Sequence, residues 1–376
     1  MKYQPLLGFA RSFGGRSKRA VANNRDTPML ADRIEAKWID AFARVFALCK
    51  VTEGETVALL SETQSRVLNV RLAELALQRL GARPFHVMVP TPPQDAPVPV
   101  RSTGASAALG GQAAAIQALK ASGLVVDLTV EGLLHAPELP QVLADGARLL
   151  MVSNEHPDAL ERLVPAEGDD VRVKDAVRRV RGAAAMTVTS AAGTDLTVDL
   201  HEASTVGVWG WCDRPRTVAH WPAGLVVSFP RAGSVNGRLV LDAGDANLTF
   251  KRYLDSPVAL TLVDDYVTAI DGTGTDAELM RRYFAAWGDR EAYATSHVGF
   301  GMNARARYEA LAMYDRRDTN GTELRAYAGN FLYSTGANEF AGRFTKGHFD
   351  LPVRGCTIAL DGVPVVVDGE LAEDLR

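Results

Sequence analysis

The sequence is short of the features that mark several easily recognised protein classes. Its only cysteines, Cys49, Cys212 and Cys356, are widely spaced, and no CxxC pair occurs. This argues against a disulfide framework or a cysteine-rich zinc site and favours a reducing compartment, which we expect to be the cytoplasm. The sequence has no apolar run long enough to span a bilayer, and residues 1–28 lack the apolar segment of a secretory signal. We therefore expect no membrane anchor.

Two phosphate-binding motifs and a strong net charge are also missing. No GxGxxG follows the first expected strand, and GxxxxGK[ST] does not occur, which argues against dinucleotide-binding and P-loop folds. The net charge is −4 and the pI is about 6.0. Neither value suggests a nucleic acid or an anionic membrane as a partner.

What remains is typical of a globular protein with more than one domain. Apolar residues make up 47% and charged residues 23% of the 376 residues, a length at which two domains are the default. Residues 1–28 are basic, and we interpret them as an N-terminal arm, either partly extended or disordered. Residues 29–184 alternate helical patterns with short apolar strands, as in 56–60, 85–89, 124–128 and 147–152. This pattern predicts an α/β domain with a parallel sheet.

The pattern changes near residue 185. Short strands separated by turns follow, and Asp264-Asp265 and Asp361-Gly362 each lie between two apolar runs, as in a β-hairpin. Helices are expected over Asp276–Trp287 and Ala304–Leu311. We predict a mainly antiparallel α+β domain over 185–376 that carries the catalytic, metal-binding residues.

The most informative stretch is Lys346-Gly347-His348-Phe349-Asp350-Leu351, which precedes residues typical of a strand. Residues two apart in a strand point to the same face, so His348 and Asp350 are predicted to project side by side. A second histidine, for which His297 is the candidate, would complete a two-His-one-carboxylate site that leaves metal positions open.

The pattern by itself is compatible with a simpler role. With 7 histidines and 45 acidic residues, about one His-x-acid pair is expected by chance. His156-Pro157-Asp158 is a second such pair, and its proline indicates the start of a helix. The alternative for His348 is a histidine at a strand edge that pairs with a neighbouring aspartate.

Several runs in the C-terminal half resemble a known family. Residues 296–301 (SHVGFG), 329–336 (GNFLYSTG), 348–354 (HFDLPVR) and 220–224 (HWPAG) are similar to segments of bacterial 2,5-dihydroxypyridine 5,6-dioxygenases. Upstream, 125–127 and 133–138 are similar as well. The resemblance extends from about residue 40 to about residue 365, and the family is itself similar in sequence to thermophilic metal-dependent aminopeptidases.

The resemblance implies an extradiol-type dioxygenase that takes part in nicotinate degradation. Fe(II) would be held by His297, His348 and Asp350. The enzyme would use O2 to open a hydroxylated pyridine such as 2,5-dihydroxypyridine to N-formylmaleamate, or would act on a similar hydroxylated aromatic compound. The resemblance also implies a homo-oligomer.

The same resemblance implies roles for further residues. His135 and His220 correspond to histidines of the substrate pocket and are expected to act as general base and general acid, in an order that stays open. Leu134, Val208, Arg325, Ser334 and Thr335 are expected to contact the substrate. One departure concerns Val208, because the family carries a glutamate there, so a different ring is a possible substrate.

Two other interpretations stay open at this point. One is a metal-dependent aminopeptidase-like enzyme or amide hydrolase with zinc or cobalt, although we find no convincing pair of additional bridging glutamates in the sequence. The other is a non-catalytic ligand-binding or assembly protein. Metal content and stoichiometry would distinguish them, because the dioxygenase needs one iron and the dinuclear hydrolase needs two metal ions.

Overall fold

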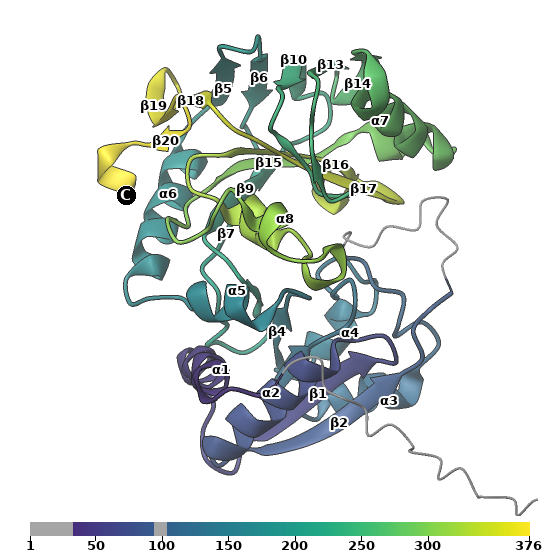
Figure 1. Ribbon diagram of the computed structural model, residues 1–376, viewed down its shortest axis with the longest axis vertical. Coiled ribbons are helices and arrows are strands. Elements are labelled where there is room, and N and C mark those ends of the chain that lie inside the picture. The colour runs from purple at the N-terminus through teal and green to yellow at the C-terminus, as the bar shows by residue number, and fades with distance from the viewer. Residues whose placement is uncertain (1–32, 94–103) are drawn as a thin grey trace, which may run out of the picture. The chain divides into compact units, whose positions relative to one another are not determined.

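The computed structural model describes residues 33–93 and 104–376 (Figure 1). The predicted N-terminal arm, residues 1–28, lies outside the described residues. Ile34–Arg376 is one of the two units into which the chain divides, and the account below concerns this unit alone. Its elements form three main sheets.

The first sheet is parallel, and its central strands are buried on both faces. Its five strands run in the order β2-β1-β3-β4-β8, with all pairs parallel. The strands are β1 (Thr56–Glu62), β2 (Arg83–Val89), β3 (Leu124–Asp127), β4 (Arg148–Val152) and β8 (Val218–Trp221). The helices of this part are α1 (Ala36–Leu48), α2 (Val67–Arg79), α3 (Ala113–Lys120), α4 (Leu139–Leu143) and α5 (Pro157–Arg162).

The two faces of this sheet belong to two separate apolar clusters. Val57 and Leu59 of β1 pack with α1 and α2, whereas Ala58 and Leu60 pack with α3 and α4. Alternate residues of one strand are therefore buried on opposite faces, which explains the nearly continuous apolar strands of the sequence. The α/β prediction for this part of the chain is confirmed.

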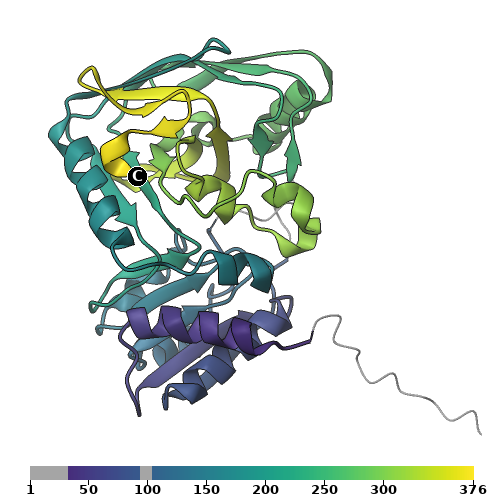
Figure 2. The same ribbon diagram turned by 60° about the vertical axis from the view of Figure 1, so that its left-hand side comes forward.

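The second sheet is antiparallel and has eight strands in the order β14-β13-β10-β6-β5-β18-β19-β20. Its strands are β5 (Ala185–Ser190), β6 (Asp195–Asp199), β10 (Val235–Leu241), β13 (Val258–Val263), β14 (Tyr266–Asp271), β18 (Cys356–Leu360), β19 (Val363–Val367) and β20 (Glu370–Leu371). Both predicted hairpins, β13–β14 and β18–β19, are present. Figure 2 shows the C-terminal strands, in yellow, beside the teal segment that leads into β5, and β18 pairs with β5.

The third sheet is also antiparallel and has the strand order β17-β16-β15-β9-β7. Its strands are β7 (Ser204–Val208), β9 (Leu225–Phe229), β15 (Thr295–Gly301), β16 (Phe331–Asn338) and β17 (Arg343–Val353). One face, with Phe300, Tyr333 and Phe349, shares a core with the second sheet and with helices α6 (Asp169–Gly182) and α7 (Gly274–Ala286). The mainly antiparallel fold predicted for this region is thus confirmed.

The remaining elements are short. They are β11 (Ala246–Asn247), β12 (Arg252–Tyr253), α8 (Ala310–Met313), α9 (Thr322–Ala326) and the 3-10 turns Arg290–Tyr293, Arg316–Asp318, Glu339–Ala341 and Glu373–Leu375. None of the helices in the described ranges is both long and apolar enough to cross a membrane.

The helix expected over Ala304–Leu311 is wrong, since only α8 forms there. The Asn303 side chain accepts a hydrogen bond from the Arg305 backbone N–H and donates one to the Ala223 carbonyl. These bonds hold the preceding backbone in a turn, and a turn of this kind competes with helix formation.

The predicted division at residues 184 and 185 falls between α6 and β5. β8, which comes from beyond this point in the sequence, completes the first sheet. The domain boundaries remain a prediction.

Candidate metal centre and active site

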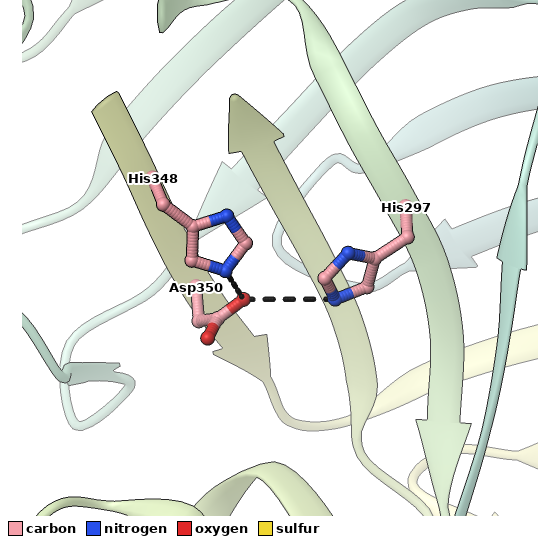
Figure 3. Close-up of side chains that lie close together, drawn as sticks. All are labelled: His297, His348 and Asp350. Atoms are coloured by element: carbon pink, nitrogen blue, oxygen red, sulfur yellow. Dashed lines mark ion pairs between the residues drawn. The ribbon is translucent and has the colours of Figure 1, made fainter. Parts of the chain in front are cut away.

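Strands β15 and β17 bring three potential metal ligands together. In β17, His348 and Asp350 alternate with the core residue Phe349 and therefore share the opposite face. The register of the sheet aligns Asp350 with Ser334 of β16 and Ser334 with His297 of β15. His297 and Asp350 thus lie in one row across three strands (Figure 3).

The ligand atoms of the three side chains converge. The Asp350 Oδ1 atom lies 3.1 Å from His348 Nε2 and 3.7 Å from His297 Nε2. One ligand atom from each residue lies within 4.8 Å of the others. Two imidazole nitrogens and a carboxylate oxygen at such separations form a donor set that suits a divalent transition metal.

A β-bulge directs the His297 side chain toward His348 and Asp350. The β15–β16 register shifts between Thr295 and His297. Thr295 therefore faces the core, where its hydroxyl lies 3.1 Å from that of Tyr333, while His297 faces the other side. Bulges commonly re-aim a side chain next to an active site in this way.

Ser296, the bulged residue, orients the His297 ring. The Ser296 hydroxyl donates to the Ala337 carbonyl at 2.5 Å, and its oxygen lies 3.1 Å from His297 Nδ1. Because its single proton is used on Ala337, Ser296 accepts a hydrogen bond from Nδ1–H. The Nε2 lone pair of His297 is thereby left free and directed at Asp350.

The Asp350 carboxylate is fixed from two sides. Ser334 donates to Oδ1, and the Arg325 guanidinium, from α9, pairs with Oδ2. Burial opposes ionisation of Asp350, but the charges of His348 and Arg325 outweigh it and hold its pKa well below its usual range. Burial also lowers the pKa of His297 to about 3. A neutral imidazole and an ionised carboxylate are the forms that bind a metal.

A cavity of about 320 Å³ opens over the three residues and is lined by both halves of the unit. From the first half it receives Leu134 and His135, which follow β3 and its loop. It also receives His220 of β8. The ring centroid of His135 lies 5.5 Å from that of His348. The site thus lies at the carboxyl ends of parallel strands, where α/β sheets generally bind ligands.

His220 presents a hydrogen-bond acceptor to the cavity. Its Nδ1 atom lies 2.6 Å from the Pro222 carbonyl oxygen, which can only accept, so Nδ1 carries the proton and Nε2 is unprotonated. Burial lowers the pKa of both His220 and His135 to about 4. Both rings are therefore neutral near pH 7 and available to receive a proton.

The residues predicted to contact a substrate divide into two groups. Leu134, Val208 and Arg325 line the cavity. Ser334 lies behind Asp350 and bonds to its carboxylate, and Thr335 points to the core face, opposite Phe349. Neither Ser334 nor Thr335 is among the described residues that line the cavity. That any of the five residues contacts a substrate remains a prediction.

Sequence reasoning missed several residues of the site. Ser296 adjoins a predicted ligand, and a hydroxyl at that place is the one signal that could have identified it. Asn320 and Thr322 line the cavity because the buried Glu155 carboxylate accepts hydrogen bonds from their backbone N–H groups. The sequence carries no signal for this long-range contact.

Comparisons with known proteins agree with this geometry. A family model described as 2,5-dihydroxypyridine 5,6-dioxygenase matches residues 37–373. A Pseudomonas putida KT2440 protein of that name is 37% identical over 340 residues, which cover 89% of this chain and 96% of the relative.

Two solved structures are also similar. The 2,5-dihydroxypyridine dioxygenase structure from Pseudomonas putida KT2440 matches with a TM-score of 0.85 and 36% identity, over 92% of this chain and 100% of that one. AmpT from Thermus thermophilus matches with a TM-score of 0.62 at 15% identity, over 89% and 99% of the two chains. This second likeness concerns the fold alone.

Proposed function

Because the chain belongs to the 2,5-dihydroxypyridine 5,6-dioxygenase family, we propose that it is a non-haem Fe(II) dioxygenase. Its substrates are O2 and a hydroxylated pyridine such as 2,5-dihydroxypyridine, which it opens to N-formylmaleamate, or a similar hydroxylated aromatic compound. The observation that carries this proposal is the convergence of His297, His348 and Asp350 at a cavity large enough for an aromatic ring.

The donor set fits the proposed iron. Two imidazole nitrogens and one carboxylate oxygen on one face of a sheet leave further coordination positions open toward the cavity, an arrangement typical of non-haem Fe(II) oxygenases. When bound, Fe(II) supplies the electron-transfer chemistry that allows O2 to react with an aromatic ring. Among the described residues, the cluster is the one group of three or more potential ligands, which supports a single metal ion.

The protein's own residues position the reactants and move protons. The cavity holds the ring over the metal ligands, and its partial enclosure limits access of water. His220 accepts a proton at Nε2, so it is suited to receive one from a ring hydroxyl. His135, beside His348, is placed for the complementary transfer. Which histidine acts first as the base stays open.

The remaining cavity residues bind the substrate in this proposal. Arg325 presents a guanidinium beside Asp350 and favours a negatively charged oxygen on the ring. Leu134 and Val208 provide apolar contacts. Ser334 acts through the carboxylate it bonds. We also propose a homo-oligomer, which light scattering after gel filtration would test.

The deciding experiment is O2 uptake after anaerobic loading with Fe(II), with 2,5-dihydroxypyridine as the first substrate. We expect one O2 consumed for each ring lost and one iron per chain. No uptake with any hydroxylated ring, together with zinc- or cobalt-dependent cleavage of a peptide or amide, would contradict the proposal and favour a hydrolase.

His348→Ala provides the matched variant. It removes one of three ligands, so metal binding and O2 uptake should both fall below detection while the circular dichroism spectrum stays unchanged. His201→Ala, which removes an exposed histidine at a turn, serves as the control. Full activity in His348→Ala would refute the site.

A further inference from the structure

The cavity has a second, apolar region, of which the proposed function uses Val208 alone. Five of its lining residues form what we call the aliphatic wall: Val206, Val208, Leu225, Val227 and Leu332. Leu225, Val227 and Leu332 form a small apolar cluster with Ala326, against which Val208 and Phe229 pack. None of these side chains can take part in proton transfer or metal binding.

The register of the third sheet fixes where the wall lies. Val206 pairs with Val227 and Val208 pairs with Leu225 across β7 and β9. Leu332 lies two residues before Ser334 in β16, on the same face as the row that holds His297 and Asp350. At about 3.3 Å per residue, the wall begins about 7 Å from that row and extends to about 13 Å.

The cavity is also larger than a single ring requires. Its volume is about 320 Å³, whereas an apolar cavity of about 150 Å³ suffices for benzene. A ring held at the metal ligands therefore leaves space beside the aliphatic wall. A polar substituent in that space would lose water without gaining a hydrogen bond from these side chains, whereas an apolar group would gain from burial.

We propose that the natural substrate is a hydroxylated ring that carries an apolar substituent or a fused apolar ring on the edge pointing away from the metal ligands. This inference rests on the proposed function and narrows its substrate class. The histidines and Arg325 bind the oxygenated edge of the ring, and the aliphatic wall binds the hydrocarbon edge.

The test measures binding of an alkyl series to the full chain loaded anaerobically with Zn(II), a redox-inactive ion that suits the same donor set. The ligands are 2,5-dihydroxypyridine and its methyl, ethyl and propyl derivatives at ring carbon 3 or 4, neither of which is part of the bond to be cleaved. Isothermal titration calorimetry gives Kd for each. We expect each methylene to tighten binding about fourfold in the series that points at the wall.

A wall variant separates contact with these side chains from general hydrophobicity. Val208→Thr keeps the side-chain volume but places a hydroxyl on the wall, so the gain per methylene should shrink. Val206→Thr, at the end of the wall nearer the metal ligands, should shrink it as well. Val263→Thr, at an exposed position in the second sheet, should leave it unchanged.

The outcomes distinguish the inference about the apolar substituent from the dioxygenase proposal on which it rests. If the unsubstituted ring binds but neither series tightens with chain length, the inference about the substituent is wrong while the dioxygenase proposal stands. If no member binds to metal-loaded protein, both are wrong. A gain per methylene that Val208→Thr and Val206→Thr leave intact would also overturn the role of the aliphatic wall.

Discussion

His297 illustrates how much of a proposed ligand's chemistry depends on its neighbour. The ring can bind a metal through Nε2 because Ser296 accepts a hydrogen bond from Nδ1–H. Ser296 acts as the acceptor because its own hydroxyl proton is donated to the Ala337 carbonyl. A chain of two hydrogen bonds thus sets the tautomer. Such outer contacts generally tune metal affinity without touching the metal.

Ser296→Ala should weaken metal binding. Loss of the acceptor for Nδ1–H frees the ring to rotate or change tautomer, and losses of this kind reduce affinity by roughly 10–100-fold. Competition with a chromogenic chelator would give the Kd. Ser190→Ala, at the end of β5, is the control and should leave the Kd unchanged. An unaltered Kd in Ser296→Ala would show that the hydroxyl does not orient the ring.

For single residues, the sequence was informative where the spacing of two residues along a strand is enough to place their side chains on the same face. His348 and Asp350 could be paired from their separation of two residues, because alternation in a strand is a local property. His297 is 51 residues before His348, so no local spacing links the two; the sequence named it as a candidate only, and the family resemblance strengthened that choice. Asn320 depends on a contact with the distant Glu155, and no local pattern encodes such a contact.

Among the structural elements, the loop after β3 depends on a buried carboxylate. Asp127, at the end of β3, accepts hydrogen bonds from the Thr129 hydroxyl, the Thr129 N–H and the Leu133 N–H. These bonds shape the segment that leads to Leu134 and His135. Burial nevertheless raises the pKa of Asp127 from its ordinary 3.8 to about 6.

Asp127→Asn should change the pH dependence of stability. Because the folded-state pKa is raised, the folded chain keeps a proton that the unfolded chain releases between about pH 4 and pH 6. The contribution of Asp127 to the free energy of unfolding therefore falls as pH rises through this window, by roughly 3 kcal/mol at most.

Urea unfolding of both proteins at several pH values tests this effect. The wild type should lose stability relative to Asp127→Asn between pH 4 and pH 6, and the difference should be constant above that window. Asp145→Asn, at an exposed position, is the control. A difference between wild type and Asp127→Asn that is independent of pH would contradict the buried titration.

Strand β15 also leaves no space for a side chain at Gly299. A Cβ atom added there would lie 1.9 Å from the Val226 carbonyl oxygen of β9, which belongs to the backbone and cannot turn aside. Gly299→Ala should therefore separate β15 from β9 and destabilise the fold by roughly 1–3 kcal/mol or more. Thermal unfolding would measure the loss.

The control is Gly182→Ala, where an added Cβ meets nothing within 4 Å. That substitution should leave stability nearly unchanged. Equal midpoints for the wild type and Gly299→Ala would mean that the sheet can widen at this point without cost.

Element prediction succeeded where the apolar period was strong and failed where side chains compete for the backbone. The hairpins β13–β14 and β18–β19 follow from turn residues between apolar runs. The Ala304–Leu311 segment contains good helix formers, yet its first residues form a turn. The Asn303 side chain holds this turn through hydrogen bonds with the Arg305 N–H and the Ala223 carbonyl. Helix propensity is too weak to resist such contacts.

For the whole molecule, the site joins segments that are far apart in sequence. His135, His220 and the three proposed ligands come from both the parallel and the antiparallel parts. The sequence indicated both parts, but the cavity arises only when they pack together. The aliphatic wall in particular depends on the pairing of β7 with β9, which valine content alone does not encode.

Metal loading should stabilise the entire fold. An ion that binds the folded state alone at 100 times its Kd adds about 2.7 kcal/mol to the free energy of unfolding. We therefore expect the Tm to rise on adding Fe(II) anaerobically and to fall again with a chelator. His348→Ala should show no rise, whereas His201→Ala should behave as the wild type. Equal shifts in both variants would place the stabilising metal elsewhere.

The position of β8 has a practical consequence for anyone who wishes to study the parallel sheet in isolation. A fragment that ends at residue 184 would omit β8, and the edge of β4 would lose its partner. That edge consists of Leu149, Leu150, Met151 and Val152, which are buried in the intact chain. An unpaired apolar edge recruits strands from other molecules, so such a fragment should aggregate. A soluble version would require residues 218–221 to be grafted back as a fifth strand.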